Sequence, residues 1–177
     1  MPDKTRSIDF VTISLRDALD LAVLVEEEAR DRYEEFADQM EKHHNPEAAR
    51  FFRLMLQVEA RHEHRLSDRR KRLFGDDPRT VTREMIFDVE APEYDEVRAN
   101  MTLRQALMAS LRAETKAFEF FESSAEKVQM RNVRDLFSEL RDEERQHRAL
   151  VEGELAKLPR EPDIPIYLYD EDEIVAL

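Results

Sequence analysis

Two copies of one short motif, Glu59-x-x-His62 and Glu144-x-x-His147, are the residues of this chain best suited to chemistry. Residues three positions apart lie on one face of an α-helix, so each motif can present a carboxylate oxygen and an imidazole nitrogen to the same point. That pair of donors suits iron or manganese, and also zinc. Two further glutamates, Glu26 and Glu114, each precede one motif by about 30 positions. These six residues are the candidate ligands of a centre for two metal ions.

The six candidate ligands interrupt apolar stripes. In four segments, apolar residues recur at alternating steps of four and three, the pattern of helices packed in a bundle. The first stripe reads Leu15, Leu19, Ala22, Glu26, Ala29, Tyr33, Phe36 and Met40. The other stripes carry Glu59 with His62, Glu114, and Glu144 with His147 near their middles. The sequence therefore predicts that all six converge at one level of the bundle core.

Electrostatics then requires cations at this level. Burying an unpaired ion costs several kcal/mol, whereas a whole domain is stable by only about 5–15 kcal/mol. The central stripes contain no lysine or arginine, so the balancing charge must come from bound metal. Four carboxylates and two neutral imidazoles balance two divalent ions, and we expect two iron ions (Fe²⁺/Fe³⁺), with manganese or zinc as alternative occupants. Five glutamates lie off the stripes and are expected on a solvated face: Glu27, Glu28, Glu34, Glu63 and Glu143.

Capping signals delimit the helices that must position these groups. Ser14 with Asp17 begins the first helix, Asn45-Pro46 the second, and Thr102 with Gln105 the third, while Gly75 ends the second. The predicted core helices are about 14–43, 46–74, 102–129 and 132–158. They form a domain over 1–158, with a long crossover from Asp76 to Ala99. The proline-containing tail, 159–177, is expected to be extended.

The two halves of the chain repeat one another. Leu15-Arg-Asp-Ala-Leu19 matches Leu103-Arg-Gln-Ala-Leu107, and the same offset places Glu26 on Glu114 and Tyr33 on Phe121. Two similar helical hairpins joined by one long crossover make an all-α, ferritin-like four-helix bundle.

Composition narrows the function classes. With 177 residues the chain fits one domain, and its lack of cysteine excludes disulfides, thiolate zinc sites and iron–sulfur clusters. A net charge of −13 argues against a nucleic-acid partner. The sequence has no apolar run long enough for a membrane span and no apolar leader at its start, so we expect a cytoplasmic protein without a membrane partner.

The motifs resemble the rubrerythrin branch of the ferritin-like di-iron carboxylate superfamily. The matching segments begin at Glu26, Val58 and Asp142, and the resemblance covers roughly Leu15 to Leu158. It implies a non-haem di-iron oxidoreductase that reacts with hydrogen peroxide or dioxygen. Without cysteine there is no rubredoxin domain, so the resemblance implies a separate electron donor. Rubrerythrins often carry one more ligand glutamate on the third helix, where this chain has Leu111 and Ala117 flanking Glu114. The haem-binding methionine of bacterioferritins is Ala60 here, so no haem is expected.

Several alternatives stay open at the level of sequence. The centre can reduce peroxide in oxidative stress, oxidise Fe²⁺ as a ferroxidase, oxygenate an organic substrate, or hold zinc without turnover. Tyr33 is a candidate catalytic residue, as a hydrogen-bond donor or electron relay, or a packed core residue. The remaining histidines are expected to be exposed: His43, His44 and His64. Apolar residues left over on the first two helices predict a homodimer or higher homo-oligomer: Val23, Leu24, Phe51 and Leu54.

Overall fold

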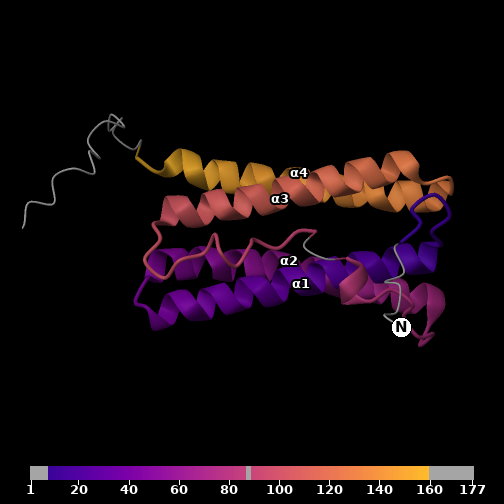
Figure 1. Cartoon of the computed structure of the whole chain (residues 1–177), viewed down its shortest axis with the longest axis horizontal. Helices are drawn as coiled ribbons and strands as arrows, with labels where there is room; N and C mark the ends of the chain where they lie inside the picture. The colour runs from indigo at the N-terminus through magenta and orange to yellow at the C-terminus, as the bar shows by residue number, and fades with distance from the viewer. Residues whose placement is uncertain (1–7, 87–88, 160–177) are drawn as a thin grey trace, which may run out of the picture.

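A computed structural model of the chain describes residues 8–86 and 89–159. The described residues form four long helices and one short 3₁₀-helix, and the prediction of an all-α four-helix bundle is confirmed (Figure 1). These elements are α1 (Leu15–Lys42), α2 (Pro46–Phe74), η1 (Arg83–Met85), α3 (Leu103–Lys127) and α4 (Arg131–Lys157). Within the described ranges, none of the helices has the length and apolarity needed to cross a bilayer. The tail that the sequence predicts to be extended lies, beyond Pro159, outside the described residues.

The predicted caps hold the helix ends. The Ser14 hydroxyl accepts a hydrogen bond from the Asp17 amide at 3.1 Å, and Thr102 with Gln105 forms a reciprocal capping box. Asn45 caps α2, whose first residue is Pro46. Gly75 ends α2 with a φ of 59°, a left-handed conformation that favours glycine. Three of the four long helices therefore begin where a side chain accepts hydrogen bonds from free backbone amides, whereas α4 begins after Met130 without a side-chain cap.

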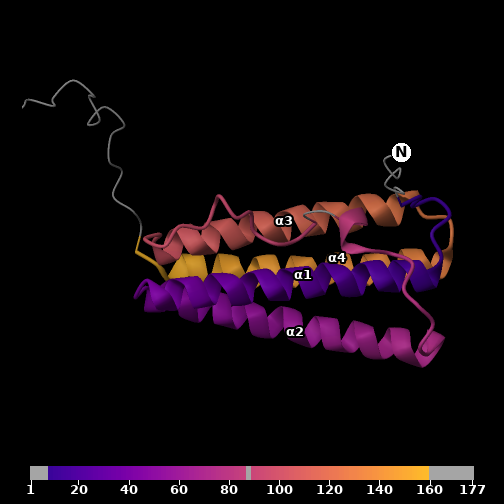
Figure 2. The same cartoon turned by 60° about the horizontal axis from the view of Figure 1, so that its bottom comes forward.

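The bundle consists of two antiparallel hairpins, α1 with α2 and α3 with α4 (Figure 1). The crossover, residues 75–102, returns along the length of the bundle from the end of α2 to the start of α3 (Figure 2). This long return makes α2 and α3 run in the same direction, the topology expected of a ferritin-like fold. It also lays an irregular segment directly over the helices.

The apolar core is divided into two clusters along the bundle axis. One contains Leu19, Phe121 and Phe137, and the other contains Phe36, Phe52 and Leu107. On every helix the candidate ligands fall between the residues of these two clusters. The stripe pattern therefore places a single polar level across the middle of an otherwise apolar core.

The apolar residues predicted to remain for an oligomer interface are mostly used within the chain. Val23, Leu24 and Phe51 are 1%, 6% and 6% exposed, and only Leu54 is exposed, at 38%. The prediction that these four form a free face was wrong. The crossover and the segment before α1 contribute Val81, Ile86 and Ile13 to the same core cluster as Val23 and Leu24.

A buried ion pair joins the start of α1 to the end of α2. The Arg70 guanidinium donates to the fully buried Asp20 carboxylate at 2.8 Å. Its other nitrogens donate to the carbonyl oxygens of Gly75 and Asp77 at 2.9 and 2.5 Å. One arginine therefore joins α1, α2 and the start of the crossover.

Candidate metal centre

The structure brings all six predicted ligands together at the polar level of the core. Glu26, Glu59, Glu114 and Glu144 are completely buried, and His147 is 4% exposed. His62 is the most accessible, with 18% of its side chain exposed. Each of the four helices contributes a carboxylate, and α2 and α4 each add the imidazole one turn further along.

His147 lies among three carboxylates. Its Nδ1 is 3.2 Å from Glu114 Oε2, 3.3 Å from Glu144 Oε2 and 3.7 Å from Glu59 Oε1. The carboxylates come from three different helices, so their convergence depends on the packing of the two hairpins. Their geometry offers oxygen and nitrogen donors around one point.

His62 lies beside the first group, with its ring centroid 4.7 Å from that of His147. Its Nδ1 is 4.0 Å from Glu26 Oε1 and 3.4 Å from Glu143 Oε2. The prediction that Glu143 lies on a solvated face was wrong, because it is only 9% exposed. Glu143 points from α4 toward α2, where it pairs with both His62 and Arg65.

The donor set fits metal ions. Both carboxylate oxygens of Glu26, Glu59 and Glu144 are buried without a hydrogen-bond partner, as is Nε2 of His147. Within the described ranges, no lysine or arginine forms an ion pair with Glu26, Glu59, Glu114 or Glu144. Ligand atoms of the cluster approach within 4.8 Å of one another in several groups, for example those of Glu59, His62 and His147. Oxygen and nitrogen atoms that lie this close together, lack hydrogen-bond partners and are not paired with lysine or arginine match what divalent cations bind.

In the metal-free chain three of these carboxyl groups hold protons more tightly than usual. Burial raises the pKa of Glu26 to about 7. Burial, and then the charges of neighbouring carboxylates, raises the pKa values of Glu59 and Glu144 well above the ordinary range. Because a bound metal needs the ionised form, metal binding must release protons from this cluster.

The two imidazoles shift in opposite directions. Burial lowers the pKa of His62 to about 3, and the positive charge of His147 adds to this effect. Burial alone would also lower the pKa of His147, but the hydrogen bond and charge of Glu114 outweigh it and raise the pKa to about 9. His62 is therefore ready to bind a metal at neutral pH, whereas His147 must first lose a proton.

Tyr33 contacts the centre directly. Its hydroxyl donates a 2.7 Å hydrogen bond to Glu114 Oε1. Burial, and then the charge of Glu114, raises the pKa of Tyr33 well above its ordinary value, so the hydroxyl keeps its proton and stays a donor. The side chain thus orients one predicted ligand, while it also packs against Phe52 with ring centroids 6.1 Å apart. The histidines outside the motifs, His43, His44 and His64, are exposed, as predicted.

A further buried acid of the cluster, Glu90, was missed by the sequence analysis. It lies on the crossover, is 1% exposed, and points into the same cluster. The helical period that marks the other six residues has no counterpart in an irregular segment, so no repeat pattern identifies it. The only sequence signal is its place among apolar neighbours, Val89 and Ala91.

Comparisons with known proteins agree with the four-helix fold. A sequence model of the family described as Rubrerythrin matches residues 17–163. The crystal structure of an uncharacterized conserved protein from Magnetospirillum magnetotacticum is similar, with a TM-score of 0.66 and 27% sequence identity. The similarity covers 86% of this chain and 99% of that one. No match to a curated protein was found.

Proposed function

We propose that this chain, which belongs to the rubrerythrin family, is a non-haem di-iron oxidoreductase that reduces hydrogen peroxide, or dioxygen, with electrons from a separate donor. The observation that carries the proposal is the convergence of four carboxylates and two imidazoles, nearly all buried and unpartnered, at one level of the core. The proposed ligands are Glu26, Glu59, His62, Glu114, Glu144 and His147. When bound, two ferrous ions supply the two electrons that, with two protons, convert one hydrogen peroxide molecule into two water molecules.

The side chains around the centre exclude water, orient a ligand and hold a proton. Burial of the carboxylates keeps bulk water away and strengthens every electrostatic interaction within the site. Tyr33 fixes the orientation of Glu114 through its hydrogen bond. The pKa of His147, about 9 in the metal-free chain, lets this imidazole hold a proton until an ion displaces it.

Access to the centre is best at His62. Its side chain is 18% exposed, compared with 5% for His147 and 0–1% for the ligand carboxylates. Arg65 and Glu143 form an ion pair at the same edge. This limited exposure favours a small oxidant such as peroxide over a large organic substrate.

Anaerobic rapid mixing of the iron-loaded protein tests the proposed activity. The proposal expects oxidation by hydrogen peroxide to be faster than oxidation by dioxygen, with repeated turnover when a reductant is added. Iron uptake far beyond two ions per chain would instead identify a ferroxidase. If the metal-free protein bound no Fe²⁺ on titration, both activities would be ruled out.

The ligand assignment has its own test. Glu59→Gln should abolish the absorption of the paired iron centre, because it replaces a buried anionic donor with a neutral amide. Glu63→Gln is the matched control, since Glu63 lies on the same helix but pairs with Arg30. Retention of the paired-iron absorption by the Glu59 variant would contradict the assignment.

A further inference from the structure

Glu90 is a buried acid on the crossover. Its side chain is 1% exposed, and neither carboxylate oxygen has a hydrogen-bond partner. No lysine or arginine of the described chain forms an ion pair with it. A packed apolar side chain at this position would avoid the cost of burying a carboxyl group, which is on the order of several kcal/mol when it is ionised and unpaired. A cation bound from outside the chain would offset this cost.

The position of Glu90 indicates where that cation would bind. Its carboxylate oxygens lie within 4.8 Å of donor atoms in two groups, one formed with Glu59, Glu114 and His147 and the other with Glu26 and Glu144. Glu90 is the only residue that these two groups share. It therefore stands between donors contributed by both hairpins.

We infer that Glu90 is a seventh metal ligand, supplied by the crossover and placed to bridge the two ion positions. The inference rests on the proposed function, because it requires the dimetal centre. It also gives the chain a fifth carboxylate where the third helix has only Leu111 and Ala117 beside Glu114.

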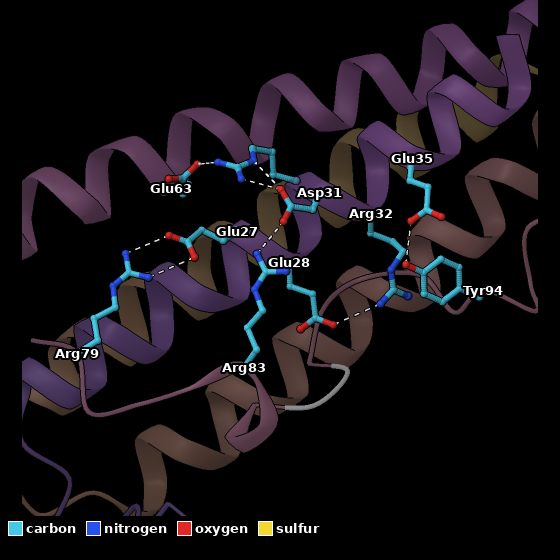
Figure 3. A network of polar contacts seen from close by, with 10 residues as sticks. Glu27, Glu28, Asp31, Arg32, Glu35, Glu63, Arg79, Arg83 and Tyr94 are labelled. Atoms are coloured by element: carbon cyan, nitrogen blue, oxygen red, sulfur yellow. Dashed lines mark hydrogen bonds and ion pairs between the residues drawn. The ribbon is translucent and has the colours of Figure 1, made fainter.

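Ion pairs hold the crossover against α1 before it reaches Glu90 (Figure 3). Arg79 donates to both oxygens of Glu27 at 3.0 and 3.2 Å. Arg83 donates at 2.7 Å to Asp31, which lies one helical turn after Glu27 on α1. These pairs place the segment along α1 at the height of the metal level.

A second set of contacts holds the crossover just after Glu90. The Arg32 guanidinium donates to the carbonyl oxygen of Pro92 at 2.8 Å and lies over the Tyr94 ring, 3.9 Å from its centroid. The Tyr94 hydroxyl in turn donates to Glu35 at 2.8 Å (Figure 3). Because the crossover is anchored on both sides, Glu90 can be held inside the bundle without a helix of its own.

A fifth carboxylate changes the charge of the centre. Five carboxylates with two neutral imidazoles carry −5, so two divalent ions leave −1 and two trivalent ions leave +1. The added negative charge strengthens the binding of cations, and its effect is greatest on the more highly charged pair. The crossover therefore tunes both affinity and the balance between oxidation states.

Cobalt(II) titration of the metal-stripped, full-length protein tests this inference without relying on activity. The titration is run in competition with a chelator on the wild type, Glu90→Gln and Glu93→Gln. Glu93 is the matched control because it lies on the same segment, carries the same charge and is 53% exposed in its pair with Lys116. We expect Glu90→Gln to weaken the binding of at least one Co²⁺ by roughly 10- to 100-fold, and Glu93→Gln to bind like the wild type.

Further variants separate the possible failures. Wild-type affinity in Glu90→Gln, together with lost binding in Glu59→Gln, would overturn the seventh ligand but leave the proposed centre intact. Wild-type affinity in both variants would overturn the centre itself. If Glu90→Gln fails to fold, Glu90→Leu provides the same test, because an apolar side chain suits a site next to Val89 and Ala91. In that variant, two Co²⁺ ions bound at wild-type affinity would overturn the inference.

Discussion

Raising the pH should destabilise the metal-free protein, and the contribution of His147 can be worked out from its pKa. The hydrogen bond and charge of Glu114 outweigh burial and raise the pKa of His147 from 6.5 to about 9 in the folded chain. The protonated imidazole therefore stabilises the folded state fully below pH 6.5, and this contribution is lost as the pH rises through about 9. Since each pKa unit corresponds to about 1.4 kcal/mol, the loss amounts to about 3 kcal/mol.

Three buried acids of the cluster act in the same direction between pH 6.5 and 9. Burial raises the pKa values of Glu59, Glu90 and Glu144 in the folded chain. The free energy of unfolding therefore also falls as the pH rises and these groups ionise. His62 has a pKa of about 3 in the folded chain, so above pH 6.5 it is neutral in both states and adds little. A loss of this size is a large part of a typical stability of about 5–15 kcal/mol.

Urea denaturation, followed by circular dichroism, measures the effect on protein stripped with a chelator. We expect the free energy of unfolding to fall by at least the roughly 3 kcal/mol that His147 contributes across this pH range. His147→Gln should have a shallower pH dependence, because the substituted side chain does not titrate. Zinc-loaded protein should vary little, since its ligands are already deprotonated. The reasoning would be refuted if the metal-free wild type kept a constant stability, or if His147→Gln showed the same slope.

Three substitutions test the contacts that support the centre, each by urea denaturation. Tyr33→Phe removes the hydrogen bond to buried Glu114 and should cost about 1–3 kcal/mol; an unchanged stability would contradict its role as a donor. Arg70→Leu leaves Asp20 buried without its partner and should cost about 3–5 kcal/mol, most of which a second change, Asp20→Leu, should restore. Additive losses in that double variant would contradict the pairing. Asn45→Ala removes the cap of α2 and a 2.8 Å hydrogen bond to the Met101 carbonyl oxygen, and should cost about 2 kcal/mol; a cost near zero would show that neither contact matters.

The periodic parts of the molecule are the parts that the sequence predicts well. An apolar stripe selects one helix face, so Glu26 and Glu114 could be placed in the core from their spacing alone. Caps such as Ser14 and Thr102 mark helix starts because their side chains satisfy free amides nearby in sequence. Both kinds of information are local, and both held.

Contacts between distant segments escaped the sequence analysis. Glu143 is next to a stripe residue and points sideways, and its burial depends on α2 bringing His62 and Arg65 to it. Val23 and Leu24 were predicted to lie on a free face, because the spacing of apolar residues identifies only one buried face of a helix. In the structure the crossover covers a second face of α1. Glu90 was missed for the same reason, because its depth is set by the path of an irregular segment.

The hydrogen bond from Tyr33 breaks the twofold likeness of the two halves. Glu114 accepts the hydrogen bond from the Tyr33 hydroxyl. In the other half of the repeat, Phe121 stands where the tyrosine would be. Glu26, the counterpart of Glu114, therefore has no such donor, and both of its oxygens lack a hydrogen-bond partner. One carboxylate is therefore oriented by a hydrogen bond and the other is not. The two halves of the proposed centre are consequently inequivalent, so two metal ions should bind to it in order rather than together.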